Sequence, residues 1–379
     1  MKKKYVLFSI VTLVLLVALI TSFNYFKTTN AYIDDSVNNQ TKITKGISMN
    51  LEQTAGAGDY KTVTQSSWPT EGYKFNAELS KCEKGSTLSW DDTKKAVIVS
   101  GNLSDKCYVY FDIYQPTLAE YIKSQYTGTQ GDNGIYYHNS SLTNGAGDNS
   151  YRFAGASDSV NNYICLGSDK ATCPDANLFR IIGVFGDQTK VIRAKSVGNK
   201  QWNRSSNTWS SSSLNTYLNG EYLTSLGTLA DKIATTTWKA GGGIWSNIVT
   251  SVPKTAYQNE VGSSASSTTV DKKIGLMYVS DYYYSASPSA WTLVGYNSND
   301  ATKDYRAATS TNWLYLGSIE WTISRNSGYT YGAFLVDSTG RVIHDYVTIS
   351  FAVRPSFNLL SSTTYVSGSG SMSDPVRVK

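Results

Sequence analysis

The chain has 379 residues, of which 40% are apolar and 17% are charged, so it is long enough for two domains and can bury a core in each. Its formal net charge is +5, but Lys2, Lys3 and Lys4 supply three of these charges, and the remaining two give no basic face for a nucleic-acid partner. The 28 tyrosines and 9 tryptophans favour β-rich domains outside the cytoplasm over a cytosolic enzyme.

An apolar segment follows the three lysines and runs from Tyr5 to Phe23. About 20 apolar residues cross a bilayer as a helix, and lysines in front of such a helix keep the N-terminus in the cytoplasm. The sequence therefore predicts a membrane anchor over residues 1–26, a polar stalk over residues 27–45, and a single-pass protein of the cell membrane whose body is extracellular. The alternative is a cleaved signal peptide with a poor cleavage site at Thr29-Asn30-Ala31. Both interpretations export the rest of the chain.

Residues 46–115 alternate short runs rich in Val, Ile, Tyr and Phe with polar turn-forming clusters, which is typical of antiparallel strands. In the last run, Cys107, Val109, Phe111 and Ile113 fall on one face, opposite three tyrosines and an aspartate. This alternation predicts a half-buried strand. We therefore expect a small β-sandwich module of about 70 residues, near the lower size limit for independent stability.

The four cysteines occur as two local pairs. Outside the cytoplasm an even number of cysteines indicates disulfide bonds. Four cysteines allow three pairings, and closeness in sequence favours Cys82–Cys107 and Cys165–Cys173. Their spacing matches neither a redox-active CxxC motif nor a zinc site.

Residues 116–379 are predicted to form one α+β domain. Its first element is a short helix in which Thr117 and Glu120 make a capping box. A hairpin follows over residues 177–196, with its turn at Gly186-Asp187.

The second half of this domain is predicted to begin with an amphipathic helix over residues 209–227, capped by Ser210 and Gly227. Residues 273–284 (KIGLMYVSDYYY) are predicted to form a strand. Residues 312–360, which are rich in tryptophan, are predicted to close the domain with a hairpin and a last strand.

Several segments together resemble a known domain. The series FRIIGVF, SSSSLNTYLN, IGLMYVSDY, NWLYLGSIEW, GRV and VRPSFNLL resembles a domain of unknown function in bacterial exported proteins, which is similar in pattern to the sulfatase-modifying-factor type of C-type-lectin-like fold. The resemblance covers residues 151–379. The run KCEKGSTLSWDD with SDKCYVYFD resembles the small module that precedes this domain in Gram-positive surface proteins.

This resemblance implies a loop-rich lectin-like fold in which Trp313, Trp321, Arg354 and Pro355 are signature positions of the fold. The oxidase members of the wider family act through cysteines late in the domain. No cysteine follows Cys173, so the resemblance does not bring that activity to this chain.

The candidate ligand-binding residues are Arg325, Asn326, Asp281, Tyr283 and Trp321. The pair Arg325-Asn326 has two interpretations, because it either binds a polar ligand in a groove or satisfies buried backbone groups. Asp281 beside a run of tyrosines fits a carbohydrate, since aromatic faces stack on sugars, but a strand with one tyrosine face packed on the helix also explains the run. Arg354 is predicted to be a buried pin for a loop carbonyl or carboxylate.

Loop carboxylates are the candidates for a metal site. Asp281, Asp300, Asp304 and Glu320 would coordinate calcium, as lectin-like domains sometimes do, although no EF-hand spacing is present. With only two histidines in the chain, a three-histidine zinc site is excluded. His344 is predicted to lie on a surface strand, and neither a resident cofactor nor a catalytic site is predicted.

The sequence therefore predicts an α+β fold class with an N-terminal transmembrane helix, a small β-sandwich module and a loop-rich C-type-lectin-like domain. The predicted function is that of an exported, membrane-anchored bacterial surface protein, not an enzyme, which binds an extracellular ligand such as a glycan or mediates adhesion. Two alternatives stay open: a structural component of the cell envelope, and a secreted hydrolase that uses a pair of loop carboxylates.

Overall fold

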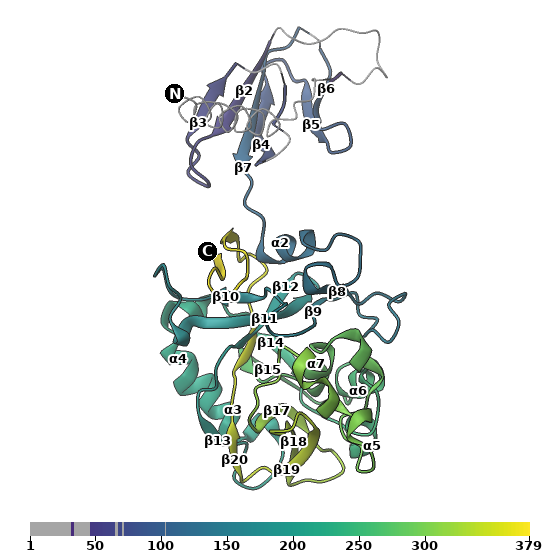
Figure 1. Cartoon of the computed structure of the whole chain (residues 1–379). Coiled ribbons are helices and arrows are strands. Elements are labelled where there is room, and N and C mark those ends of the chain that lie inside the picture. The colour runs from purple at the N-terminus through teal and green to yellow at the C-terminus, as the bar shows by residue number, and fades with distance from the viewer. Residues whose placement is uncertain (1–31, 34–45, 65–66, 70–71, 103) are drawn as a thin grey trace, which may run out of the picture. The chain divides into compact units, whose positions relative to one another are not determined.

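The structure is a computed structural model that describes residues 32–33, 46–64, 67–69, 72–102 and 104–379 (Figure 1). The described chain divides into two compact units, one ending at Gln115 and the other spanning Pro116–Lys379. Each unit has its own core, and each is described separately below.

Two β-sheets that share one core form the N-terminal unit. The first sheet has the strand order β3-β2-β7-β4 and the second has the order β1-β6-β5. The strands are β1 (Tyr32–Ile33), β2 (Ile47–Glu52), β3 (Tyr60–Val63), β4 (Tyr73–Cys82), β5 (Thr87–Asp91), β6 (Ala96–Ser100) and β7 (Cys107–Ile113). Met49 of β2, Val97 of β6 and Phe111 of β7 are buried together between the sheets. As the alternation in β7 predicts, Cys107, Val109 and Phe111 are buried while Tyr108, Tyr110 and Asp112 are partly exposed.

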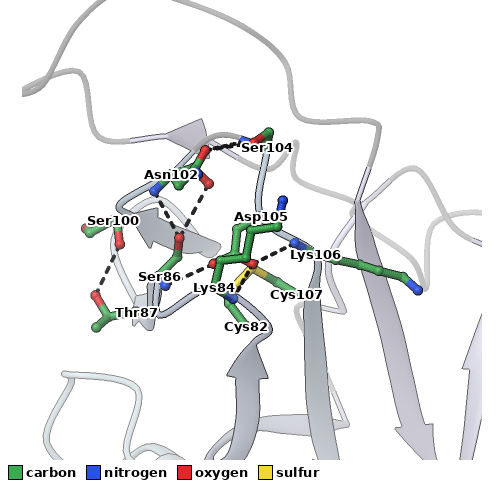
Figure 2. The surroundings of a disulfide bond; sticks show 10 residues. All are labelled: Cys82, Lys84, Ser86, Thr87, Ser100, Asn102, Ser104, Asp105, Lys106 and Cys107. Carbon is green, nitrogen blue, oxygen red and sulfur yellow. Dashed lines mark hydrogen bonds between the residues drawn. A yellow bond between two sulfur atoms is a disulfide. The ribbon is translucent and has the colours of Figure 1, made fainter.

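A disulfide joins the end of β4 to the start of β7. Cys82 and Cys107 are directly paired across the two strands, and their sulfurs are bonded (Figure 2). Beside them, the carboxylate of Asp105 accepts hydrogen bonds from the backbone N–H groups of Lys84 and Ser86, which fixes the loop after β4. The predicted Cys82–Cys107 pair is therefore confirmed.

The C-terminal unit is built on a nine-stranded mixed sheet and a five-stranded sheet. The large sheet has the order β16-β21-β12-β11-β10-β23-β22, with β9 paired to β11 and β8 paired to β9. The five-stranded sheet has the order β13-β20-β17-β18-β19, and β14 and β15 form a separate ribbon. The strands of this unit are β8 (Ile135–Tyr137), β9 (Tyr151–Phe153), β10 (Tyr163–Cys165), β11 (Leu178–Phe185), β12 (Gln188–Arg193), β13 (Asn199–Gln201), β14 (Thr236–Lys239), β15 (Thr269–Lys272), β16 (Ile274–Gly275), β17 (Glu320–Arg325), β18 (Gly332–Val336), β19 (Val342–Tyr346), β20 (Ser350–Ala352), β21 (Ser356–Asn358), β22 (Tyr365–Ser367) and β23 (Val376–Val378). The predicted hairpin of β11 and β12 is confirmed, with its turn at Gly186-Asp187.

The helices of this unit are short (Figure 1). They are α2 (Leu118–Ser124), α3 (Ser213–Tyr217), α4 (Leu223–Ser225), α5 (Trp245–Ile248), α6 (Pro253–Glu260) and α7 (Val279–Tyr284), with a π turn η5 (Leu218–Tyr222). The 3₁₀ segments are η2 (Asp132–Gly134), η3 (Asp175–Asn177), η4 (Trp209–Ser211), η6 (Gly227–Lys232), η7 (Pro288–Thr292), η8 (Ala301–Lys303) and η9 (Tyr305–Thr311). Helix α2 has the predicted capping box, because the Thr117 hydroxyl accepts from the Glu120 N–H while the Glu120 carboxylate accepts from the Thr117 N–H.

Two arginines tie distant segments of this unit together. Arg354 is buried and donates to the Glu320 carboxylate at 2.7 Å and to the Leu314 carbonyl at 2.6 Å, as predicted for a buried pin. The second predicted disulfide, Cys165–Cys173, is also present. The Arg377 guanidinium donates to the carbonyls of Ser168 and Lys170 within the loop that this disulfide closes.

The predicted continuous helix over residues 209–227 is wrong in its details. The segment consists of η4, α3, η5 and α4, and its first α-helical piece is capped by Ser212 and not by Ser210. The π turn carries Asn219, whose side-chain amide donates a hydrogen bond to the Ile274 carbonyl on β16 and accepts one from the Ile274 N–H. This tertiary contact anchors the segment to the large sheet.

The predicted strand over residues 273–284 is also wrong. Only β16 is a strand, and the tyrosine run forms α7. The buried Glu260 carboxylate accepts the N–H groups of Val279 and Ser280, and Asp281 accepts the N–H of Tyr278. These carboxylates satisfy the free N–H groups at the start of the helix, so the segment is stable as a helix.

The predicted fold class needs a correction at the N-terminus. It included a transmembrane helix, but residues 1–26 and most of the predicted stalk lie outside the described residues. Among the helices that the structure does describe, none is both long and apolar enough to cross a membrane. Over the described residues the fold class is α+β, and most of the regular structure there is β-sheet.

Candidate functional site

A cavity of about 240 Å³ lies between the large sheet, the β14–β15 ribbon and helices α6 and α7. Its walls are formed by Asp148, Arg152, Phe185, Lys190, Thr236, Thr237, Trp238, Lys239, Tyr257, Val261, Tyr278, Ser280, Asp281 and Asn358. A larger cavity of about 760 Å³ borders the Cys165–Cys173 loop and the C-terminus. The smaller cavity is the stronger candidate, because buried charged and aromatic side chains converge on it, as is typical of ligand sites.

A buried lysine occupies the base of this pocket. Lys190 lies on β12, where its Cα is paired with Gly183 of β11 and Asn358 of β21. Its Nζ is 2.5 Å from Oδ2 of Asp281, and both side chains are almost fully buried. Because α7 carries Asp281, the capping of α7 by Glu260 sets the position of the carboxylate that neutralises Lys190.

A second ion pair lies on another wall. The Arg152 guanidinium is 2.5 Å from Oδ2 of Asp148, and its Nε donates to the Ser150 hydroxyl at 2.8 Å. The Tyr257 hydroxyl donates to the same Asp148 carboxylate at 2.9 Å. The pocket therefore holds two cations and two carboxylates in pairs, and Lys239 is a further cation in its lining.

Aromatic rings surround both cations. Lys190 Nζ is 4.4 Å from the ring centre of Tyr278 and 5.3 Å from that of Trp238. The Arg152 guanidinium is 4.8 Å from the Phe185 ring and 5.2 Å from the Tyr257 ring. Rings at these distances attract a cation through their negative faces, so the side chains form a fixed scaffold.

The Trp238 wall depends on a glycine beneath it. A Cβ at Gly275 of β16 would lie 2.8 Å from the Trp238 ring, which is closer than side chains pack. The Trp238 Nε1 donates to the Lys272 carbonyl at 3.0 Å. The indole is therefore fixed by Gly275 against its face and by this hydrogen bond at its edge.

For the charged side chains of the pocket, burial shifts the pKa towards the neutral form, and the paired charge shifts it towards the charged form. Burial lowers the pKa of Lys190, and the neighbouring Asp281 opposes this effect. Burial acts to raise the pKa of Asp148, but the Arg152 charge and the hydrogen bonds from Ser150 outweigh it and hold this pKa well below its ordinary value. Burial raises the pKa of Tyr257 and of Tyr278, so both phenols are neutral at pH 7.

Several polar atoms of the pocket have no partner among the described residues. The Asn358 Oδ1 is buried and accepts no hydrogen bond, while its Nδ2 donates to Thr236 Oγ1. The Arg152 guanidinium donates through Nε and Nη2 only, which leaves Nη1 free within the described structure. Both bonds to the Asp281 carboxylate go to Oδ2, so Oδ1 is also available. A ligand that fills the pocket meets both donors and acceptors.

The residues that the sequence suggested for ligand binding do not lie together. Asp281 lines the pocket, but Tyr283 is fully buried and donates to the Ile248 carbonyl. Trp321 is in the core, where its Nε1 donates a hydrogen bond to the Lys200 carbonyl. Arg325 donates to the Gly241 carbonyl, which matches the interpretation that it satisfies backbone groups. Asn326 is buried and bonds His344.

The suggested calcium ligands are used in other ways. Glu320 pairs with Arg354, Asp304 pairs with Arg306, and Asp300 caps η8. Within the described ranges, no group of three or more His, Cys, Asp or Glu side chains is placed to hold a metal ion.

The residues missed by the sequence analysis are Arg152, Lys190, Trp238, Tyr257 and Asn358. Lys190 offered little signal, because its strand, QTKVIR, also contains Gln188, Thr189 and Arg193, and so polar a strand does not indicate that its lysine is buried. The others come from separate elements, and only the tertiary fold brings them together.

Comparison with known proteins gives no further identification: no family model, no curated protein and no solved structure matches the chain.

Proposed function

We propose that this is an exported surface protein whose C-terminal unit binds a neutral sugar residue of a glycan in the pocket around Lys190 and Asp281. The observation that carries the proposal is the combination of two balanced ion pairs, aromatic walls and unpartnered hydrogen-bonding atoms in one cavity. A ligand for such a site needs apolar faces and several hydroxyl groups, and it needs no net charge.

The chemistry of a sugar ring fits these groups. The C–H face of a pyranose packs on aromatic rings such as those of Phe185 and Tyr257, which line the pocket and are partly exposed, and whose π faces are negative. Its hydroxyls donate to Asn358 Oδ1 and Asp281 Oδ1 and accept from Arg152 Nη1. Each such bond also satisfies a buried polar group, which is costly to leave unpaired.

The size of the pocket favours one ring over a larger ligand. Its volume of about 240 Å³ lies below the roughly 300–1,000 Å³ of pockets that enclose drug-sized ligands. We therefore expect recognition of a single residue at the end or on a branch of a glycan. The two disulfides support a location outside the cytoplasm, where such bonds persist.

A glycan array probed with the full chain tests this proposal, with free monosaccharides as competitors. We expect reproducible binding to neutral glycans and competition by one monosaccharide. Asn358→Ala removes one acceptor and should weaken binding about 3- to 10-fold, given the net value of a hydrogen bond. Asn177→Ala is the matched control, because that amide holds only the loop carbonyls of Leu166 and Gly167. Absence of binding across neutral glycans, or equal losses in both variants, would contradict the proposal.

A further inference from the structure

A cluster of exposed aromatic side chains lies apart from the residues that line the pocket. Five of the ten exposed large apolar side chains in the described structure gather here, and we call this cluster the tyrosine surface: Ile244, Tyr329, Tyr331, Tyr346 and Ile349. The Tyr329 ring contacts the rings of Tyr331 and Tyr346, the Ile349 N–H donates to the Tyr346 carbonyl, and Ile244 packs beside Gly328. Exposed apolar patches of this kind mark binding sites.

The Tyr329 ring is steeply inclined to two neighbouring tyrosine rings of this surface. The centre of the Tyr329 ring is 6.2 Å from that of Tyr331 and 5.9 Å from that of Tyr346, with interplanar angles of 70° and 73°. One face of Tyr329 stacks on the His344 ring at 5.5 Å and 19°. The exposed part of Tyr329 is therefore on its other face, next to two rings that are more than half exposed.

The base of the tyrosine surface is fixed. The Gly328 N–H donates to Asn326 Oδ1, so Asn326 Nδ2 is the atom that donates to His344 Nδ1, at 2.6 Å. His344 Nδ1 is then an acceptor, and the imidazole carries its proton on Nε2. Burial lowers the pKa of His344, against the opposing effect of Asp345, so the ring beneath Tyr329 is uncharged at pH 7.

Seven other tyrosine rings of the described residues have a cation of the protein over them. Lysine or arginine side chains lie over the rings of Tyr108, Tyr163, Tyr217, Tyr257, Tyr278, Tyr284 and Tyr296. Over Tyr329, Tyr331 and Tyr346, by contrast, no lysine or arginine of the described residues is within cation–π distance. These three electron-rich rings are not covered by a cation of the described residues. The charge that acts on His344, beneath Tyr329, is the Asp345 carboxylate.

We propose that Tyr329, Tyr331 and Tyr346 form an aromatic cage for a quaternary ammonium group, such as the trimethylammonium group of choline. Several ring faces around one cation are the arrangement that recognises such ligands, because the cation is too poorly hydrated to prefer water and the π faces are negative. An uncharged, fixed base with a carboxylate nearby suits a cation and not an anion. This site takes a different ligand class from the sugar pocket, so either proposal can fail without the other.

Titration of the full chain with tetramethylammonium and choline chlorides at constant ionic strength, followed by calorimetry or NMR, tests the cage. The neutral isostere 3,3-dimethylbutan-1-ol is the control ligand, because it has the same shape without the charge. We expect saturable binding of both cations and at least about 5-fold weaker binding of the isostere. Tyr331→Leu and Tyr346→Leu should each weaken cation binding at least about 5-fold, a loss of about 1 kcal/mol per ring face, while the Phe variants keep it.

Tyr114→Leu is the matched control variant, since Tyr114 is an exposed tyrosine of the N-terminal unit. Cosedimentation with phosphatidylcholine vesicles, but not with phosphatidylglycerol vesicles, would show that the quaternary ammonium group belongs to a lipid surface. Binding of free choline without cosedimentation would assign it to a soluble or polymer-borne carrier, and both results support the cage. Equal affinity for the cation and its isostere, or no saturable binding, would overturn the proposal, as would a glycan or protein partner that needs these rings while neither cation binds.

Discussion

Lys190 is the residue on which the pocket depends most. It is a cation in a buried strand, and its one close counter-ion among the described residues is Asp281. Removal of one member of a buried ion pair leaves the other charge uncompensated, whereas replacement of both members leaves none. The two charges therefore act as a unit, and the fold requires them to be present or absent together.

This dependence predicts the effect of Lys190→Met. The variant should lower the free energy of unfolding of the C-terminal unit by about 3–5 kcal/mol, because Asp281 loses its buried partner. The double variant Lys190→Met with Asp281→Asn should recover much of this loss, since the amide keeps the acceptor for the Tyr278 N–H without the charge. Denaturant unfolding of the three proteins measures both values. A single variant as stable as the wild type would show that the pair is not buried as described.

His138 predicts a pH dependence of stability. It is fully buried, its Nδ1 accepts from the Ala146 N–H, and burial holds its pKa well below the ordinary value of 6.5. Between these two pKa values the unfolded chain binds a proton that the folded chain does not. The contribution of His138 to the free energy of unfolding is therefore fully present above about pH 6.5. It falls as the pH drops towards the lowered pKa, by up to about 1.4 kcal/mol per pH unit.

The variant His138→Gln isolates this contribution, because the amide oxygen can still accept from Ala146 and does not titrate. We expect the stability difference between wild type and variant to shrink or reverse from pH 7 to pH 5. The control His344→Gln should change the slope less, since His344 is only half-buried and its pKa is lowered less. Parallel stability curves for wild type and His138→Gln would contradict the buried neutral histidine.

At the scale of the elements, local signals in the sequence predicted part of the fold. The capping box at Thr117, the β11–β12 hairpin, the alternation in β7 and both disulfides could be predicted because each depends on residues that are close in the sequence or fixed in type. Helix α7 could not, because the carboxylate that caps its first N–H groups belongs to Glu260, on another element. A short apolar run has no period that separates helix from strand.

The candidate site was less predictable than the fold. The tyrosine neighbours of Asp281 suggest a sugar-binding face, but all three of them, Tyr282, Tyr283 and Tyr284, are core residues. Arg325 and Asn326 stand out in the sequence as a polar pair, and in the structure they hold the Gly241 carbonyl and the His344 ring in place. The pocket joins segments from Asp148 to Asn358, and no sequence pattern encodes that proximity.

Removal of the Cys82–Cys107 disulfide should change the thermal stability of the N-terminal unit alone. It closes a span of 25 residues between β4 and β7 in the smaller unit. The chain-entropy model gives about 3.5 kcal/mol for a loop of this size. Cys82→Ala with Cys107→Ala should therefore lower the unfolding temperature of the N-terminal unit and leave that of the C-terminal unit unchanged in calorimetry. Equal shifts in both transitions would show that the two cores do not unfold independently.

At the scale of the whole molecule, the chain combines a small disulfide-linked β-sandwich with a larger α+β unit that carries the proposed sites. Most of the charge in the sugar pocket is paired internally, and the tyrosine surface is uncharged at its base. This suits recognition of neutral and cationic groups. The pocket is the feature on which the proposed function depends most.

The most direct test of the pocket is calorimetric titration of the best glycan from the array into the wild type and into Thr236→Phe. Thr236 is a partly exposed residue of β14 at the pocket wall, so a phenyl ring there should fill the cavity without burying a new charge. We predict that Thr236→Phe weakens binding at least about 20-fold, or by about 1.8 kcal/mol. An affinity within twofold of the wild type, in a variant that stays folded, would contradict the assignment of the ligand to this pocket.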